Sequence, residues 1–222
     1  MEKSILFIVG SPRLKRSTSY SIANYVSTAL QNKGWKTDIV FSHKIYTSEK
    51  DIETLRDRIQ KTSITGIVFP LYVDAVPGPL VQTLKRISHN PLPSQGQQNK
   101  MFAIVNSGFP EPHQSQVAVQ IIKQFTKECN ATFLGGLKIG GGGIVGGSPI
   151  DQIKNRSKRL VLALDATIES IDKDQKLSDK ALQLLSKPVF PKRIYTFFGN
   201  LGWKRRAKKY GVSNLYLTPD KK

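Results

Sequence analysis

Short apolar runs alternate with helical periodicity along most of the chain. Residues 4–9 (SILFIV) form a continuous apolar run of strand length, which is typical of a strand covered on both faces. After it, Ile22, Val26 and Leu30 recur at helical spacing as far as Gly34, a residue suited to ending a helix. Further apolar runs predict strands at residues 37–41, 64–69, 101–105 and 132–139.

The segments between these runs have the features of helices. A capping box at residues 48–51 and the pair Gly78-Pro79 each predict a helix start. The last helix of the sheet domain is expected to begin at a Ser148 cap, and the one before it to bury residues four apart, namely Val117, Ile121, Phe125 and Cys129. One more short helix is expected at residues 181–185. Because crossover helices keep successive strands parallel, we expect an α/β three-layer sandwich with a five-stranded parallel sheet of order 2-1-3-4-5.

Residues 1–177 are expected to form this domain, and residues 178–222 a helical, basic C-terminal extension packed on the same domain or on a partner subunit. The chain has 34 basic and 16 acidic side chains, a net charge of +18. From Lys187 onward there are ten basic residues and one acid, so half of that excess lies in the extension. For this aromatic and basic tail we rank subunit or cofactor-site contact first, weak contact with an anionic membrane surface second and nucleic acid third. A solvated basic face is the remaining alternative.

The apolar runs and the cysteine content of the sequence bear on cellular location and on metal binding. No apolar run approaches the roughly 20 residues of a membrane-spanning helix, and the six-residue run at the N-terminus is shorter than the core of a secretory signal. A single cysteine, Cys129, excludes an intrachain disulfide and a zinc site built on cysteines. We therefore expect a cytoplasmic protein with no bound metal, and a buried core thiol at Cys129.

Ligands of such sheets bind at the carboxyl ends of the strands, near the point where the winding reverses. The first of the loops there, GSPRLKRSTS at residues 10–19, combines the Arg13 guanidinium with four hydroxyls at a helix start, those of Ser11, Ser17, Thr18 and Ser19. Hydroxyl donors, a bidentate arginine and the positive end of a helix suit a phosphate. The motifs of ATPase and dinucleotide loops are absent, which favours a compact monophosphate. A plain hydrophilic turn is the alternative.

Three loops and the tail resemble the NAD(P)H-dependent FMN reductase family, whose members have a flavodoxin-like fold. GSPRLKRSTS is similar to that family's phosphate loop, FPLYVDAVPGP to its loop along the flavin ring, NSGFPEPHQ to the loop after its fourth strand, and GNLGWKRRAKKYG to its tail. Two positions depart from the usual pattern, Arg16 for glycine and Thr18 for asparagine.

The resemblance implies an FMN site. The five residues of the phosphate loop, Ser11, Arg13, Ser17, Thr18 and Ser19, would hold the FMN phosphate. The flavin ring would be lined by Pro70, Leu71, Tyr72 and Val73, and its polar edge would be reached by Asn106, Ser107 and Gly108. An apolar wall beside backbone donors is what a flavin requires.

The implied activity is an oxidoreductase in which NAD(P)H gives a hydride to bound FMN and a small acceptor takes the electrons. Quinones, nitro compounds and free flavin are the acceptors considered, and a homodimer or homotetramer is expected. Glu111 and His113 are candidate proton donors, but hydride transfer depends on orientation, so no catalytic residue is named. The alternatives are a flavodoxin-type electron carrier without turnover of its own and a flavin-free binding module.

Overall fold

The computed structural model describes residues 3–89, 99–155, 157–188 and 192–212. The chain divides into two compact units, Met1–Val189 and Phe190–Lys222. Residues 213–222, the end of the predicted extension, lie outside the described residues.

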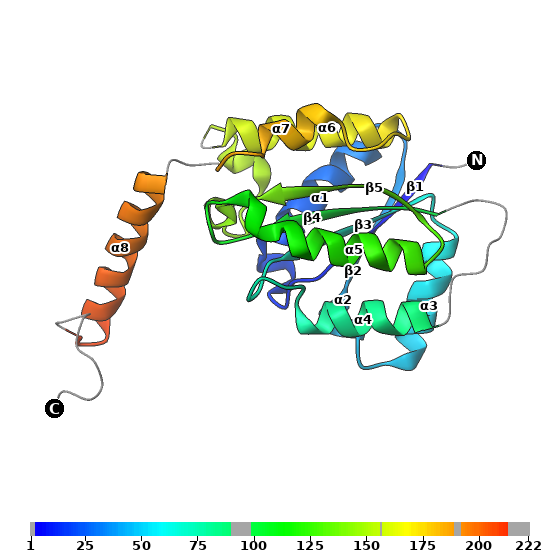
Figure 1. Cartoon of the computed structure of the whole chain (residues 1–222), viewed down its shortest axis with the longest axis horizontal. Coiled ribbons are helices and arrows are strands. Elements are labelled where there is room, and N and C mark those ends of the chain that lie inside the picture. Colours follow the sequence, from blue (N-terminus) through cyan, green and yellow to red (C-terminus); the bar gives the residue numbers. More distant parts are fainter. Residues whose placement is uncertain (1–2, 90–98, 156, 189–191, 213–222) are drawn as a thin grey trace. The chain divides into compact units, whose positions relative to one another are not determined.

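A five-stranded parallel sheet forms the centre of the first unit (Figure 1). Its strands are β1 (Ser4–Val9), β2 (Lys36–Phe41), β3 (Ile64–Pro70), β4 (Lys100–Asn106) and β5 (Thr132–Ile139). They pair in the order β2-β1-β3-β4-β5, which confirms the predicted flavodoxin-like topology. The winding therefore reverses between β1 and β3.

Helices cover both faces of this sheet, and β1 shows why its sequence is apolar throughout. Ile5, Phe7 and Val9 belong to one core cluster, together with side chains of α1 (Thr18–Gln31), α6 (Lys158–Asp172) and α7 (Asp179–Leu184). The alternating residues Leu6 and Ile8 belong to the other, formed with α3 (Glu49–Gln60), α4 (Gly78–His89) and α5 (Gln116–Glu128). Since side chains alternate across a strand, a strand buried on both faces requires apolar residues at every position.

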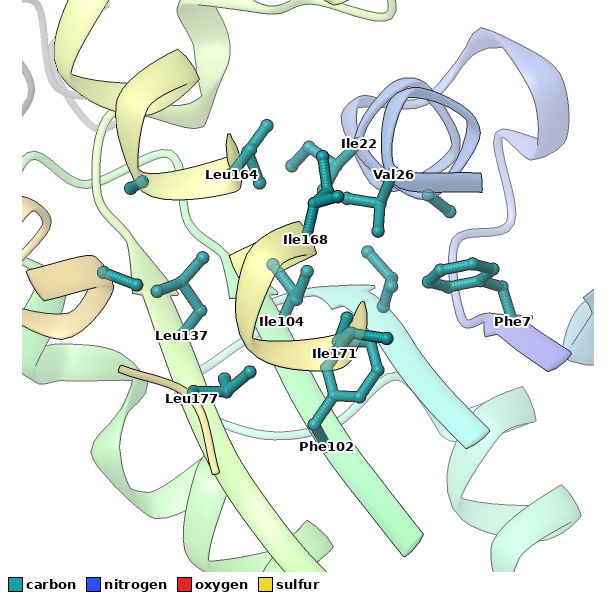
Figure 2. Close-up of a cluster of buried hydrophobic side chains, with 14 of the residues drawn as sticks. Phe7, Ile22, Val26, Phe102, Ile104, Leu137, Leu164, Ile168, Ile171 and Leu177 are labelled. Carbon is teal, nitrogen blue, oxygen red and sulfur yellow. The ribbon is translucent and has the colours of Figure 1, made fainter. Parts of the chain in front are cut away.

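The core on the α1 and α6 side is shown in Figure 2. Ile22 and Val26 of α1 and Ile168 and Ile171 of α6 lie in one cluster with side chains of the sheet, among them Phe102, Ile104 and Leu137. Phe7 and Phe102 pack edge to face, with ring centroids 6.2 Å apart. This packing holds β1, β3 and β4 together beneath the loops that follow them.

Helix starts follow the predicted caps in part. Ser48 accepts a hydrogen bond from the Asp51 N–H at 3.2 Å and so caps α3, as the capping box predicted. Ser148 does not begin a helix: residues Ile150–Ile153 form a 3-10 turn, and α6 begins at Lys158. Residues three apart eclipse in such a turn, so both Ile150 and Ile153 reach the core without an α-helix.

The predicted apolar face of α5 was wrong in two positions. Val117 and Ile121 are 60% and 39% exposed, whereas the helix buries Ala118, Val119, Ile122, Phe125 and Cys129. A strict spacing of four residues drifts around a 3.6-residue helix, so four such positions cannot share one face. Cys129 is buried as expected, and burial raises the pKa of its thiol to about 12.

The remaining elements are short or lie toward the end of the chain. They are α2 (Ser42–Ile45), 3-10 turns at Leu14–Arg16, Pro112–Ser115 and Gly142–Ile144, and α8 (Lys192–Lys209). Ala181 in α7 and Leu185 just after it are core residues of the first unit. Among the described residues no helix is long and apolar enough to cross a membrane.

Gly66 in the middle of β3 tests how tightly the sheet is packed. A Cβ there would lie 2.7 Å from Phe102 and 2.8 Å from Phe7, two fully buried rings. We expect Gly66→Ala to lower the free energy of unfolding by about 1–3 kcal/mol, because neither ring can move without disturbing the core. Urea unfolding followed by circular dichroism measures this. Gly78→Ala is the matched control, because apart from its chain neighbours and the nearby backbone of its own helix no described atom lies within 4 Å of its Cβ position. Equal losses in both variants would contradict the packing argument.

Candidate functional site

The turn between β1 and α1 is held at the carboxyl edge of the sheet. The Gly10 N–H donates to the Val68 carbonyl at 2.9 Å, which continues the ladder to β3. A Cβ on Gly10 would lie 2.6 Å from Leu80 and 2.7 Å from Phe69, so only glycine fits. Beyond it, Leu14 has a φ of +50°, a conformation that costs a non-glycine residue energy and is found where function requires it.

The hydroxyls of this loop differ in what they can offer a ligand. Ser17 is used by the fold, since its Oγ donates to the Leu14 carbonyl at 2.6 Å and accepts from the Tyr20 N–H at 3.1 Å. Thr18 Oγ1 donates to the Gly142 carbonyl at 3.1 Å. Ser11 and Ser19 instead accept, from the Arg13 N–H at 3.4 Å and from Asn106 Nδ2 at 3.0 Å. Each of these two therefore keeps its own O–H for a bound anion.

The first turn of α1 supplies further donors. Ser17 occupies the cap position, and its side chain and carbonyl satisfy the N–H groups of Tyr20 and Ser21. The N–H groups of Thr18 and Ser19, the first two helical residues, have no acceptor within the described part of the chain. Free N–H groups at the positive end of a helix form an anion site.

Asn106 at the end of β4 joins the loops to one another. Its side-chain Nδ2 donates to Ser19 Oγ at 3.0 Å and to the Phe69 carbonyl at 2.9 Å. Its backbone carbonyl accepts from the Leu71 N–H at 2.8 Å. Both hydrogens of the side-chain amide are thus engaged within the protein. The part that Asn106 can offer a ligand is its Oδ1, not the amide donors.

The loop after β3 is a tight turn that directly follows a buried residue, Leu71. Tyr72 and Ala75 exchange backbone hydrogen bonds at 3.0 Å, and the residues between them, Val73 and Asp74, have φ values of +49° and +57°. Positive φ at both central positions is the geometry of a type I′ turn. Leu71 is buried, whereas Tyr72 is 43% and Val73 98% exposed. The turn therefore presents Tyr72 beside the phosphate loop and directs Val73 into solvent.

The glycine-rich turn after β5 completes the edge. Ser107 donates its N–H to the Ile139 carbonyl and its Oγ to the Phe109 carbonyl, and its own carbonyl accepts from the Gly142 N–H at 2.7 Å. A Cβ on Gly142 would lie 3.2 Å from the Ser107 carbonyl. The backbone of the glycine turn therefore packs closely against Ser107.

These loops surround a cavity of about 170 Å3. Its lining includes every predicted site residue except Val73, and adds Gly142 and Gly143: it comprises Ser11, Arg13, Ser17, Thr18, Ser19, Pro70, Leu71, Tyr72, Asn106, Ser107, Gly108, Gly142 and Gly143. Arg13 is the charged residue of this lining, whereas Glu111 and His113 are not part of it. Among the described residues no cluster of three potential metal ligands occurs.

Lys15 lies in the same short turn as Arg13 but lines a different depression. This groove of about 470 Å3 runs along α1 as far as Asn32. The Tyr25 hydroxyl in it donates to Asp165 at 2.7 Å. Lys15 and Arg13 thus carry the same charge toward two separate places.

The fold and its edge define the class: a flavodoxin-like α/β protein with a cavity at the switch point of its sheet. A family model described as NADPH-dependent FMN reductase matches residues 4–142. The chain belongs to this family, which confirms the predicted resemblance, the FMN cofactor and the NAD(P)H donor, and makes the protein an oxidoreductase. The matched segment contains all twelve predicted site residues. No curated protein sequence matches the chain.

Solved structures share the fold at low sequence identity. General stress protein 14 of Treponema denticola in complex with FMN has a TM-score of 0.53 at 16% identity, covering 76% of this chain and 99% of its own. An FMN-dependent NADH-azoreductase of Bacillus anthracis, also in complex with FMN, has a TM-score of 0.51 at 10% identity, covering 78% and 97%. An NADH:FMN oxidoreductase in its apo form has a TM-score of 0.53 at 13% identity, covering 86% and 97%. At these identities the likeness shows the fold alone.

Arg13 and Lys15 form a matched pair for testing the phosphate site. We expect Arg13→Ala to weaken FMN binding about 10- to 150-fold, because a hydrogen-bonded charge is worth about 1.5–3 kcal/mol. Lys15→Ala removes the same charge outside the cavity and should cost less than about fivefold. Quenching of FMN fluorescence on titration with protein measures both. Equal losses would show that net charge, not the cavity, attracts the phosphate. A protein that stays colourless after it is mixed with excess FMN and desalted would favour the flavin-free binding module.

Proposed function

We propose that this FMN-dependent oxidoreductase passes a hydride from NAD(P)H through bound FMN to a small acceptor of the quinone, nitro-compound or free-flavin type. The observation that carries the proposal is the donor set around one cavity: the free hydroxyl hydrogens of Ser11 and Ser19, the free N–H groups of Thr18 and Ser19, and the Arg13 guanidinium. These groups match a terminal phosphate. The exposed ring of Tyr72 borders the same cavity.

The residues that line the cavity fit the polar, phosphate end of FMN and would leave the flavin ring partly exposed to solvent. At about 170 Å3 the cavity is smaller than the roughly 300–1,000 Å3 of typical ligand pockets, so it suits the phosphate end of the cofactor. Pro70, Leu71 and Tyr72 would border the flavin, and Asn106 Oδ1, Ser107 and Gly108 its polar edge. Val73 would meet the flavin at the outer side of the turn, since its side chain is 98% exposed.

The chain's own contribution to the reaction is binding and orientation. Bound FMN supplies the hydride chemistry. The phosphate loop and the first turn of α1 anchor the cofactor, and the turn at Val73 and Asp74 holds Tyr72 beside it with a backbone that has little freedom. The cavity lining contains no carboxylate or imidazole, so the proposal assigns no proton transfer to a side chain. Donor and acceptor would use the open side in turn.

Steady-state kinetics test this order of events. If NAD(P)H leaves before the acceptor binds, double-reciprocal plots at several acceptor concentrations should be parallel. Without oxygen, NADPH or NADH should bleach the visible absorbance of bound FMN in the absence of any acceptor. Intersecting lines would contradict the shared open side, and bound FMN that neither nucleotide bleaches would favour the electron carrier.

We also propose a cytoplasmic homodimer or homotetramer. The cytoplasm supplies NAD(P)H and keeps a lone thiol such as Cys129 reduced. For self-association, α4 and α5 present the exposed apolar side chains of Val81, Val117 and Ile121. A depression of about 290 Å3 beside them is lined by both Lys85 and Glu128. Because a two-fold axis places the same patch of both subunits face to face, Lys85 of one copy would meet Glu128 of the other.

Light scattering on the purified FMN-bound protein measures the oligomer. We expect Ile121→Glu to shift it toward the monomer, because the substitution places a charge in the apolar contact. The matched control is Leu162→Glu on α6, another exposed apolar residue of the first unit that lies outside this surface. A monomeric wild-type protein, or equal dissociation of both variants, would contradict the assignment of this surface.

A further inference from the structure

After its first two residues, Lys192 and Arg193, helix α8 (Figure 1) is divided along its sequence into an uncharged part and a basic part. Residues 194–203, IYTFFGNLGW, include four aromatic and two aliphatic residues and carry no charge. The next six residues, KRRAKK at 204–209, carry five positive charges. No acidic residue occurs anywhere between positions 187 and 212. At 1.5 Å per residue the two parts are about 15 Å and about 9 Å long.

Large apolar side chains of this helix, and of Tyr210 directly after it, are open to solvent in the unit that contains them. Phe197 is 65%, Trp203 64% and Tyr210 72% exposed. The five basic residues of the second part are exposed as well. This segment therefore combines exposed aromatic surface with a concentrated positive charge and has no carboxylate of its own to neutralise it.

The charge is spread over about 200° of the helix circumference instead of following one narrow face. Successive residues advance by about 100°, so neighbours such as Arg205 and Arg206, or Lys208 and Lys209, point in different directions. A partner that touches one face of a helix, such as a protein groove or a nucleic acid backbone, would leave much of this charge unpaired. A partner that is layered would meet the aromatic part at one depth and the basic residues on either side of it at another.

A phospholipid surface has that layering. Its anionic headgroups attract basic residues, at about 1 kcal/mol for each one near the surface, and aromatic rings are favoured at the boundary between headgroups and acyl chains. We propose that α8 is a docking element for an anionic phospholipid surface. Phe197, Leu201 and Trp203 enter the boundary layer and residues 204–209 pair with the headgroup phosphates. This contact is peripheral and salt-sensitive, and it goes beyond the proposed reaction.

Vesicle sedimentation tests the proposal on the full-length, FMN-bound protein. The probes are vesicles of phosphatidylcholine alone and of phosphatidylcholine mixed with phosphatidylglycerol. We expect binding to the mixed vesicles only, weakened by salt. Replacement of Lys204, Arg205, Arg206, Lys208 and Lys209 by glutamine should reduce the partition coefficient by on the order of 100-fold or more.

A matched variant separates this local charge from the net charge of the chain. It replaces five exposed lysines of the first unit by glutamine, at Lys50, Lys61, Lys123, Lys127 and Lys180. We expect it to bind mixed vesicles within about threefold of the wild type, since its α8 is intact. Equal loss in both variants would overturn the proposal, because bulk charge would then explain the binding.

Fluorescence and competition complete the test. On mixed vesicles the emission of Trp203 should shift to the blue, and Trp203→Phe should abolish the shift while retaining most of the binding. Tighter binding to a single-stranded RNA oligonucleotide than to the mixed vesicles, lost in the α8 variant, would overturn the proposal in favour of nucleic acid. It would also be overturned if the α8 variant binds vesicles normally but has altered FMN affinity or NAD(P)H oxidation, which would assign the helix to the flavin site. Vesicle binding and NAD(P)H oxidation are separate readouts, so failure of one proposal is distinguishable from failure of the other.

Discussion

The arrangement of the site depends on the hydrogen bonds of Asn106. This residue ends β4, donates from one amide nitrogen to Ser19 Oγ and the Phe69 carbonyl, and accepts from the Leu71 N–H. Four segments are thereby placed relative to one another: the start of α1, the end of β3, the loop after β3 and the end of β4. A buried amide left without these partners would cost about 1–3 kcal/mol per unsatisfied group, so the network is held as a whole or not at all.

The same network determines which groups remain for a ligand. Because Asn106 supplies the hydrogen that Ser19 Oγ accepts, the Ser19 hydrogen is left to point elsewhere. The hydroxyls of Ser17 and Thr18, by contrast, already have partners within the protein. Ser17 caps α1 and donates to the Leu14 carbonyl, and Thr18 donates to the Gly142 carbonyl in the glycine turn. Of four hydroxyls that look equivalent in the sequence, two shape the loop and two stay free to donate. The free pair lies beside the N–H groups of the first helical turn, where the helix dipole also favours an anion.

The fold could be predicted from the sequence because a strand buried on both faces is apolar at every position, and such a run is visible in the sequence. In β1 every position from Ile5 to Val9 is apolar, and in the structure these side chains alternate between two cores. The site could be predicted to the level of loops, since parallel strands bring their carboxyl ends to one edge. The role of Gly142 and Gly143 could not, because a glycine run fits a mobile turn and a close backbone approach equally well. The outward direction of Val73 depends on positive φ at two non-glycine residues, which composition does not reveal.

The C-terminal helix shows the limit of periodicity in another way. Methods that search for an apolar stripe compare the two sides of a helix, and α8 has no such stripe because its apolar and basic residues follow each other along the axis. Its segregation is nevertheless strong, with no charge in residues 194–203 and five cations in the next six residues. A helix can therefore separate apolar from charged residues along its axis without having an apolar stripe on one side. That property has no use in packing against one flat neighbour, and it matches a surface whose own polarity changes with depth.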